Sequence, residues 1–303
     1  MFNNKYFRQV RILDGGMGQE LLSRGMDPSG TLWSAKALIE KKYHKLLEDT
    51  HKDFIKCGAD VIVTNTFTTR KTRLKENGIE NKFEYLNKKA GEIAEKAKKN
   101  FPDVLVAGGL PPQNNTYSPD NRSKDEVYSN YYEQAKLLNP YVDFFYLDVL
   151  SSIYEINIAI DAISEFKKSY LIGAHISDGN RLPSAEKITD IVKNKDNNKL
   201  LGLILACVSP ESFEENFKEL SSLKIPFGFK INGFLRTKIM NGYTEAYKKS
   251  KTGNPNEFLG KRLDLSPKNL LKIATKFKEK GATILGGCCE TTPKHILEIS
   301  KLK

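Results

Sequence analysis

The sequence predicts an α/β protein with the (β/α)8 TIM barrel fold and elaborated βα loops, built as a single domain over residues 1–303. Eight short apolar runs alternate with eight amphipathic stretches, at about 30–40 residues per unit, which is the pattern of this barrel. The connections after the apolar runs are also longer than those after the amphipathic stretches. A doubly wound open sheet is the alternative, but the number of units and the lack of a G-x-G-x-x-G pattern after the first run disfavour it.

The apolar runs predict strands that are buried on both faces. Most of them are continuously apolar rather than alternating, which favours parallel pairing beneath a layer of helices. The predicted strands span residues 10–16, 59–67, 104–110, 142–150, 170–177, 199–209, 226–232 and 282–289.

The amphipathic stretches predict the helices of the outer ring. Several begin with Ser or Thr ahead of Pro or an acidic residue, which is the chemistry of a helix N-cap. The predicted helices span residues 41–58, 82–100, 123–139, 153–168, 184–194, 209–223, 266–281 and 292–303.

The long loops indicate where a functional site lies. In a barrel, the loops that follow the strands build the site at the C-terminal face. Three of these loops are long and irregular: residues 17–35, 111–122 and 233–265. We interpret 233–265 as an elaborated loop after the seventh strand that could act as a lid.

Composition narrows the class of protein. The formal net charge is +11, but the lysines are spread along the chain without interleaved aromatic residues, so we expect a solvated surface and no nucleic-acid partner. No apolar run has the length that crossing a bilayer needs, and the N-terminus lacks a signal peptide's apolar stretch. We therefore expect a cytoplasmic protein with no membrane partner. Its oligomeric state is uncertain from the sequence. Its four cysteines are too few for a disulfide framework.

Three of the four cysteines fall at the predicted active face. Cys207 ends the sixth strand, and Cys288 and Cys289 end the eighth. Clustered cysteines in a reducing compartment more often bind a metal than form a disulfide, and three thiolates with one open position suit a catalytic Zn²⁺ site. Both members of the pair can face one ion only where the strand bends, and Gly286-Gly287 offer that freedom. Simple core packing is the alternative, and it is our interpretation of Cys57.

The order of several motifs resembles the homocysteine S-methyltransferase family, essentially from end to end. The paired-cysteine motif is highly specific, whereas the others gain their weight from appearing in this order. The motifs are LDGGMGQELLSRG (13–25), TLWSAKALIE (31–40), GADVIVTNTF (58–67), ACVSP (206–210) and GGCCETTPKHI (286–296). The piece around Trp33 resembles the branch that uses S-methylmethionine, and the betaine-using branch is a more distant match.

The resemblance implies a zinc-dependent enzyme of methionine biosynthesis, with Cys207, Cys288 and Cys289 as metal-binding and catalytic residues. Zinc removes the proton of a bound thiol, so homocysteine would present a nucleophilic sulfur. That sulfur can take a methyl group from a cationic sulfonium donor in one displacement, giving methionine. No organic cofactor is needed for this step.

The residues that end the first, second and fourth predicted strands are candidates for binding the substrates. By resemblance, Asp14 helps bind the homocysteine ammonium, and the neighbouring glycines let backbone N–H groups approach a carboxylate. A cationic donor favours an aromatic surface, for which Trp33 is the leading candidate. The expected substrate-binding residues are Asp14, Gly15, Gly16, Trp33, Thr64, Asn65 and Asp148.

Two departures from the family pattern lie near the amino-acid pocket. Asp148-Val149 stands where the family usually carries Glu-Thr, and Ala206 stands where it commonly carries Asn. They leave other readings open: betaine or dimethylsulfoniopropionate as donor, another thiol as acceptor, or a homocysteine module that works with a separate corrinoid protein. A metal-dependent barrel hydrolase is disfavoured, because it predicts His and carboxylate ligands and this chain has only four His.

Overall fold

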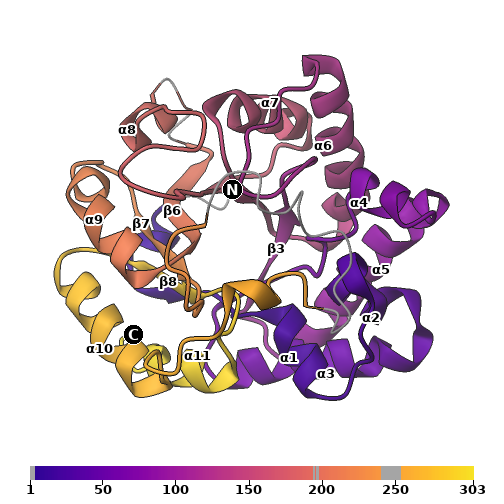
Figure 1. Cartoon of the computed structure of the whole chain (residues 1–303), viewed down its shortest axis with the longest axis horizontal. Coiled ribbons are helices and arrows are strands. Elements are labelled where there is room, and N and C mark those ends of the chain that lie inside the picture. The colour runs from indigo at the N-terminus through magenta and orange to yellow at the C-terminus, as the bar shows by residue number, and fades with distance from the viewer. Residues whose placement is uncertain (1–3, 194, 196–197, 240–253) are drawn as a thin grey trace.

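Eight parallel strands form a nearly closed barrel that is ringed by helices (Figure 1). The computed structural model describes residues 4–193, 195, 198–239 and 254–303. The strands run in the order β1-β8-β7-β6-β5-β4-β3-β2. They are β1 (Arg11–Ile12), β2 (Val61–Val63), β3 (Leu105–Leu110), β4 (Phe144–Leu150), β5 (Tyr170–Ala174), β6 (Leu200–Val208), β7 (Phe227–Ile231) and β8 (Ile284–Gly287). The predicted barrel fold and its eight strands are confirmed.

The barrel closes between β1 and β2 with few backbone contacts. A single isolated bridge, Leu13 with Val61, joins the two strands. Two carboxylates reinforce it: Asp60 Oδ2 accepts the Ile12 N–H at 2.8 Å, and Asp14 Oδ2 accepts the Val63 N–H at 2.8 Å. Side chains therefore hold this seam where the ladder is short.

A helix forms in the outer ring within each of the eight predicted helical regions, although one of them is much shorter than predicted. These helices are α3 (His44–Lys56), α5 (Phe83–Lys98), α6 (Lys124–Leu138), α7 (Ile153–Ile163), α8 (Ile188–Ile191), α9 (Pro210–Ser221), α10 (Pro267–Glu279) and α11 (Pro293–Ser300). Four of them begin with a serine side chain that accepts a backbone N–H of the first turn: Ser123, Ser152, Ser209 and Ser266. Three of these serines begin helices that the sequence predicts, and Ser152 directly precedes a predicted helix.

The helix predicted over 184–194 is mostly wrong, because only α8 forms there. Residues 181–187 instead make a small antiparallel bridge between Arg181 and Lys187, and the Leu182 N–H donates to the Glu186 carbonyl. Ala185 has a positive φ of 78°, which a helix does not allow.

Three further short helices lie in the loops after β1 and β2, where none was predicted: α1 (Met17–Ser23), α2 (Lys36–Ile39) and α4 (Lys71–Glu76). They cover one side of the barrel mouth (Figure 1). Of the expected lid over 233–265, residues 240–253 lie outside the described residues.

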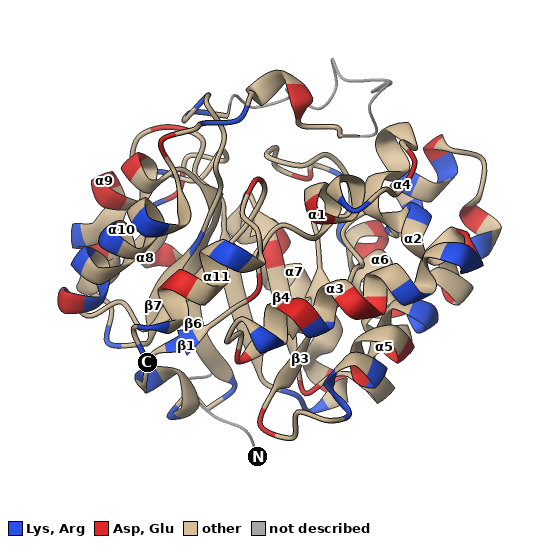
Figure 2. Ribbon diagram, turned by 90° about the horizontal axis from the view of Figure 1, so that it is seen from below, with Lys and Arg blue, Asp and Glu red and all other residues tan. Residues whose placement is uncertain are grey.

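Apolar side chains fill both the barrel interior and the layer beneath the helices. All nine residues of β6 are buried, as expected for a strand covered on both faces. On the outside, lysines, arginines and acidic residues are interspersed over the helices (Figure 2). Within the described part of the chain, no helix combines the length and apolarity that crossing a membrane demands.

Candidate metal centre and substrate pocket

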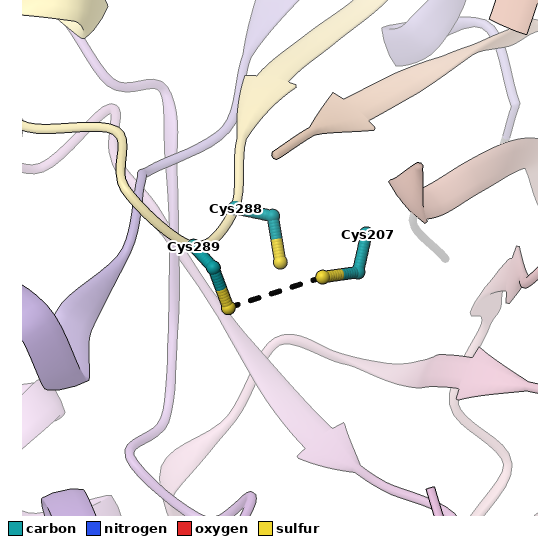
Figure 3. A group of neighbouring side chains, drawn as sticks. All are labelled: Cys207, Cys288 and Cys289. Carbon is teal, nitrogen blue, oxygen red and sulfur yellow. Dashed lines mark hydrogen bonds between the residues drawn. The ribbon is translucent and has the colours of Figure 1, made fainter. Parts of the chain in front are cut away.

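The three predicted cysteines meet at the C-terminal mouth of the barrel. Cys207 ends β6, Cys288 and Cys289 follow β8, and their side chains point toward one another (Figure 3). The three Sγ atoms lie within 4.8 Å of one another, and Cys207 Sγ is 3.9 Å from Cys289 Sγ. Thiolates bound tetrahedrally to one zinc at about 2.3 Å stand about 3.8 Å apart. The donor set therefore fits a soft divalent metal held by three thiolates.

The backbone turns at Cys207 to bring its sulfur into the cluster. Cys207 has a φ of +53°, and the register between β6 and β7 shifts between Ala206 and Val208. A positive φ is costly for a non-glycine residue, and such strain is concentrated at functional sites. The Cys207 side chain therefore departs from the alternating side-chain directions of a regular strand near the end of β6.

The role expected for Gly286 and Gly287 as a flexible bend is wrong. Neither has a positive φ, and β8 already ends at Gly287. They instead provide space: a Cβ on Gly287 would lie 2.1 Å from Thr291 Oγ1, and one on Gly286 would lie 2.8 Å from Leu13 Cβ. The turn itself has Glu290 at a φ of +64°.

Polar side chains from three other segments contact the sulfurs. Tyr117 Oη lies 3.1 Å from Cys207 Sγ, and Asn256 Nδ2 donates to Cys289 Sγ at 3.4 Å. Asn232 Nδ2 donates to the Cys207 carbonyl at 2.8 Å. Burial disfavours a thiolate at Cys207, but hydrogen bonds from Cys288, Cys289 and Tyr117 outweigh it and hold the pKa of this thiol well below its usual value. Sequence reasoning missed these neighbours, and only Asn232 stood out, as the last residue of a predicted strand.

The cluster forms one wall of a cavity of about 940 Å³, which includes its open mouth. The described residues contain seven non-glycine residues with positive φ, and four of them line this cavity: Trp33, Tyr117, Val149 and Cys207. Val149 is β-branched, so its φ of +65° is a true outlier. The strained backbone is therefore gathered around the sulfurs.

Asp14 lies in the cavity wall, but it already has a cationic partner. Lys230 Nζ, from β7, donates to Asp14 Oδ1 at 2.7 Å, and Oδ2 accepts the Val63 N–H. Both side chains are almost fully buried, with Asp14 3% and Lys230 7% exposed. Burial disfavours the charged lysine, but the charges of Asp14 and Asp148 outweigh it and raise the pKa of Lys230. Sequence reasoning missed this lysine.

Asp148 lies in the same wall, at the end of β4. Its Oδ1 is buried and makes no hydrogen bond within the described part of the chain. Burial raises its pKa to about 7, against the opposing charge of Lys230. This carboxyl is therefore the less satisfied of the two acids at the barrel mouth.

The remaining predicted binding residues also line the cavity, but several are engaged in the fold. Thr64 Oγ1 accepts the Gly109 N–H at 3.0 Å, and Asn65 Nδ2 donates to the Ser34 carbonyl at 2.9 Å. The Gly16 N–H donates to the Thr291 carbonyl at 3.0 Å, so it is not available to a substrate carboxylate. Gly15 lines the cavity, and its role stays a prediction.

Trp33, the leading aromatic candidate for binding a cationic ligand, lines the cavity. It packs in one apolar cluster with Cys207 and Cys289, and its indole N–H is buried without a hydrogen-bond partner among the described residues. Two other aromatic residues, Phe67 and Tyr146, already lie near cations of the protein: the Arg70 guanidinium lies 5.4 Å from the Phe67 ring centre, and Lys230 Nζ lies 5.9 Å from that of Tyr146.

Two arginines add positive charge to the cavity wall. Arg70 is 1% exposed, and it donates to the Phe67 carbonyl at 2.9 Å and to Thr116 Oγ1 at 3.2 Å. Its Nε is buried and has no hydrogen-bond partner in the described chain, and burial lowers the pKa of Arg70 to about 9. Arg73 also lines the cavity and pairs with Glu76 at 2.7 Å.

Two residues outside the predicted site, His175 and Cys57, have the surroundings of core residues. His175 is buried in the barrel, where its Nδ1 lies 3.2 Å from the Ala206 carbonyl, and burial lowers its pKa to about 4. Cys57 is partly buried and packs against the main core, away from the metal cluster.

The fold of the chain is similar to that of solved structures. The metallated form of the homocysteine methyltransferase MmuM from Escherichia coli has a TM-score of 0.78, with 20% sequence identity, over 97% of this chain and 96% of that chain. The apo form of the same protein has a TM-score of 0.70 over the same shares. At this level of identity the likeness concerns the fold.

Sequence comparison extends over nearly the whole chain. Homocysteine S-methyltransferase 1 of Arabidopsis thaliana is 24% identical over 96% of this chain and 92% of its own length. The homocysteine S-methyltransferases of Escherichia coli and YbgG of Bacillus subtilis are 23% and 25% identical, each over 95% of this chain. The sequence profile described as homocysteine S-methyltransferase matches residues 11–302. The chain therefore belongs to the homocysteine S-methyltransferase family and is a methyltransferase.

Proposed function

We propose that this enzyme transfers a methyl group from a sulfonium donor of the S-methylmethionine kind to the thiol of homocysteine, giving methionine, and that it works with zinc. One observation carries the proposal: three cysteine sulfurs lie within 4.8 Å of one another on the wall of a cavity at the barrel mouth. Cys207, Cys288 and Cys289 would hold the ion and leave one coordination position for the acceptor. A bound zinc would supply acidity, keeping the acceptor sulfur deprotonated at neutral pH.

The residues of the cavity position the two substrates and exclude water. A new bond forms between the acceptor sulfur and the methyl carbon while the donor's sulfur–methyl bond breaks, and the bonding pair stays on the donor sulfur as a neutral thioether. Because charge is neutralised in this step, a dry cavity favours it, and the enzyme's main contribution is to align the reacting atoms. Asp148 supplies a carboxylate for a substrate ammonium, Asp14 holds the buried Lys230 in the same cavity wall, and Thr64 and Asn65 fix the loops of the polar wall.

The donor side of the cavity carries both kinds of group that a zwitterionic sulfonium needs. Trp33 offers an aromatic surface to the sulfonium, and Arg70 offers a buried guanidinium whose described hydrogen bonds go to neutral oxygens. The Trp33 ring and the Arg70 guanidinium together support a donor that carries both a sulfonium and a carboxylate, as S-methylmethionine does. Reduced thiolates need a reducing compartment, so the proposal places the enzyme in the cytoplasm as one domain over 1–303.

The test is a methyl-transfer assay with the zinc-loaded protein. Homocysteine is incubated with S-methylmethionine, dimethylsulfoniopropionate and betaine in parallel, and methionine is measured. We expect turnover with S-methylmethionine, and we expect Cys207→Ala and Cys289→Ala to lose both bound zinc and turnover. Cys57→Ala is the matched control and should keep both. Full activity in either ligand variant, or no methionine from any donor, would contradict the proposal.

A further inference from the structure

The ammonium of Lys230 has hydrogen-bonding capacity that its surroundings do not use. An ammonium carries three N–H donors. Within the described part of the chain, Lys230 Nζ makes one hydrogen bond, to Asp14 Oδ1 at 2.7 Å. Its side chain is only 7% exposed and forms part of the cavity wall that also contains Cys207, Cys288 and Cys289. Leaving donors of a buried cation unpaired is costly, so this position favours an acceptor supplied from the cavity.

The acids around this lysine have unequal roles. Asp14 uses one oxygen for Lys230 and the other for the Val63 N–H, so its charge is compensated within the protein. Asp148 Oδ1 is buried without a hydrogen bond to any described residue. The cavity wall therefore contains one carboxylate with an oxygen that makes no hydrogen bond and one ammonium with unused donors, which together are the complement of an α-amino acid zwitterion.

We propose that Lys230 binds the α-carboxylate of the acceptor amino acid, while Asp148 takes its α-ammonium. This inference rests on the proposed function, and it defines the acceptor class as a thiol that carries a carboxylate. Asp14 then acts through Lys230, as the residue that positions the lysine. An ion pair that serves only to stabilise the barrel interior is the competing explanation, and the experiments below separate the two.

The first experiment uses the wild-type, zinc-loaded enzyme and two acceptors that each lack one charged group. 4-Sulfanylbutanoate is homocysteine without the amino group, and 3-aminopropane-1-thiol is homocysteine without the carboxylate. Charge-assisted hydrogen bonds of this kind contribute enough for a change of about 10- to 100-fold in kcat/KM. We expect 3-aminopropane-1-thiol to lose at least that factor against homocysteine. Equal kcat/KM for homocysteine and 3-aminopropane-1-thiol would overturn the proposal.

The second experiment removes the ammonium. In Lys230→Met, kcat/KM for homocysteine and for 4-sulfanylbutanoate should fall by about 10- to 100-fold, while the low value for 3-aminopropane-1-thiol should change little. Lys230→Arg should restore part of the loss, because a guanidinium also binds carboxylates. Lys276→Met, on the exposed face of α10, is the matched control. A loss of equal size for all three acceptors would show a structural role and overturn the proposal.

The outcomes also separate this inference from the proposed function. If wild-type enzyme makes no methionine from homocysteine, the proposed function fails before any variant is compared. If it does, and zinc content is equal in wild type and Lys230→Met, the acceptor pattern tests Lys230 alone. Should Lys230→Met fail to fold, the wild-type comparison of homocysteine with 3-aminopropane-1-thiol still decides the question.

Discussion

Tyr117 Oη lies 3.1 Å from Cys207 Sγ, and both residues hold their backbones at positive φ, +64° and +53°. The tyrosine comes from the loop after β3, and the cysteine ends β6, so two strained segments from different sides of the barrel meet at one sulfur. Groups that hydrogen-bond to a metal ligand orient it and tune its basicity. We therefore expect Tyr117 to support the proposed metal site, although it offers no metal-binding atom of the kind the cysteines do.

Tyr117→Phe removes the hydroxyl and keeps the ring. Because outer partners of metal ligands typically contribute about 10- to 100-fold in metal affinity, we expect zinc binding to weaken within that range. The measurement is a competition titration against a chelator of known affinity. Tyr128→Phe, a change on α6 far from the cysteines, should leave the affinity unchanged. An unaltered affinity in Tyr117→Phe would remove this residue from the site.

Gly18→Ala should displace the indole that we propose meets the donor. A Cβ at this position would lie 2.1 Å from Trp33 Cε2, so the ring must move. Overpacking of this kind costs about 1–3 kcal/mol of stability. Trp33 is the only tryptophan, so its fluorescence reports the movement directly. We expect a shifted emission and a higher KM for S-methylmethionine.

Ser23→Ala, an exposed change in the same helix α1, is the control for the glycine substitution. It should change neither the emission nor the KM. A shifted emission in Gly18→Ala with an unchanged donor KM would show that the indole does not contact the donor.

Arg70→Met should discriminate between donors by their charge. Loss of a charge-assisted hydrogen bond to the donor carboxylate predicts a fall of about 10- to 100-fold in kcat/KM for S-methylmethionine. Trimethylsulfonium has no carboxylate, so its slow turnover should not change. Parallel initial rates with both donors are the measurement. An equal fall for both would mean that Arg70 serves only to hold the Phe67 carbonyl and Thr116 in place.

Glu155 makes the stability of the fold depend on pH, away from the metal. Burial raises its pKa from 4.5 to about 7, and the Tyr131 hydroxyl donates to Oε1 at 2.7 Å. The folded protein therefore binds this proton more tightly than the unfolded chain, and the contribution to stability is full below about pH 4.5 and is lost as pH rises through about 7. At most about 3 kcal/mol is involved.

Glu155→Gln should remove that dependence. Thermal unfolding midpoints of wild type minus variant should fall between about pH 5 and about pH 8, and the difference should flatten above the folded pKa. Glu165→Gln is the matched control, because Tyr132 donates to Glu165 at 2.8 Å in an exposed setting. A difference that rises with pH would contradict the assignment.

The strands and the three clustered cysteines could be predicted because their signals are local. A buried parallel strand is a continuous apolar run, and Cys288-Cys289 at the end of such a run implies a shared function for two neighbouring thiols. The barrel rule then placed Cys207 at the same face. Figure 3 confirms that the three sulfurs converge, although the positive φ angles near them lie at Cys207 in β6 and at Glu290 after β8 rather than at the glycines.

Lys230 could not be predicted in the same way. A single lysine in PFGFKIN (226–232) does not reveal whether it reaches solvent or a buried partner 216 residues away in sequence. Tyr117 was hidden for a similar reason, since a loop tyrosine has no periodicity to place it. The short α8 was mispredicted because helix propensity was overridden by the local bridge of Arg181 with Lys187.

Asp14 has a second role at the seam between β1 and β2. Its Oδ2 accepts the Val63 N–H across that seam, while its Oδ1 holds the lysine that we propose receives the acceptor. The Asp14 carboxylate thus contributes both to closure of the barrel and to the proposed recognition of the amino acid. A ligand that strengthens the ion pair between Lys230 and Asp14 should also slow deuterium uptake at the Val63 amide. Hydrogen exchange at this amide in the barrel wall would therefore report whether the cavity at the barrel mouth is occupied.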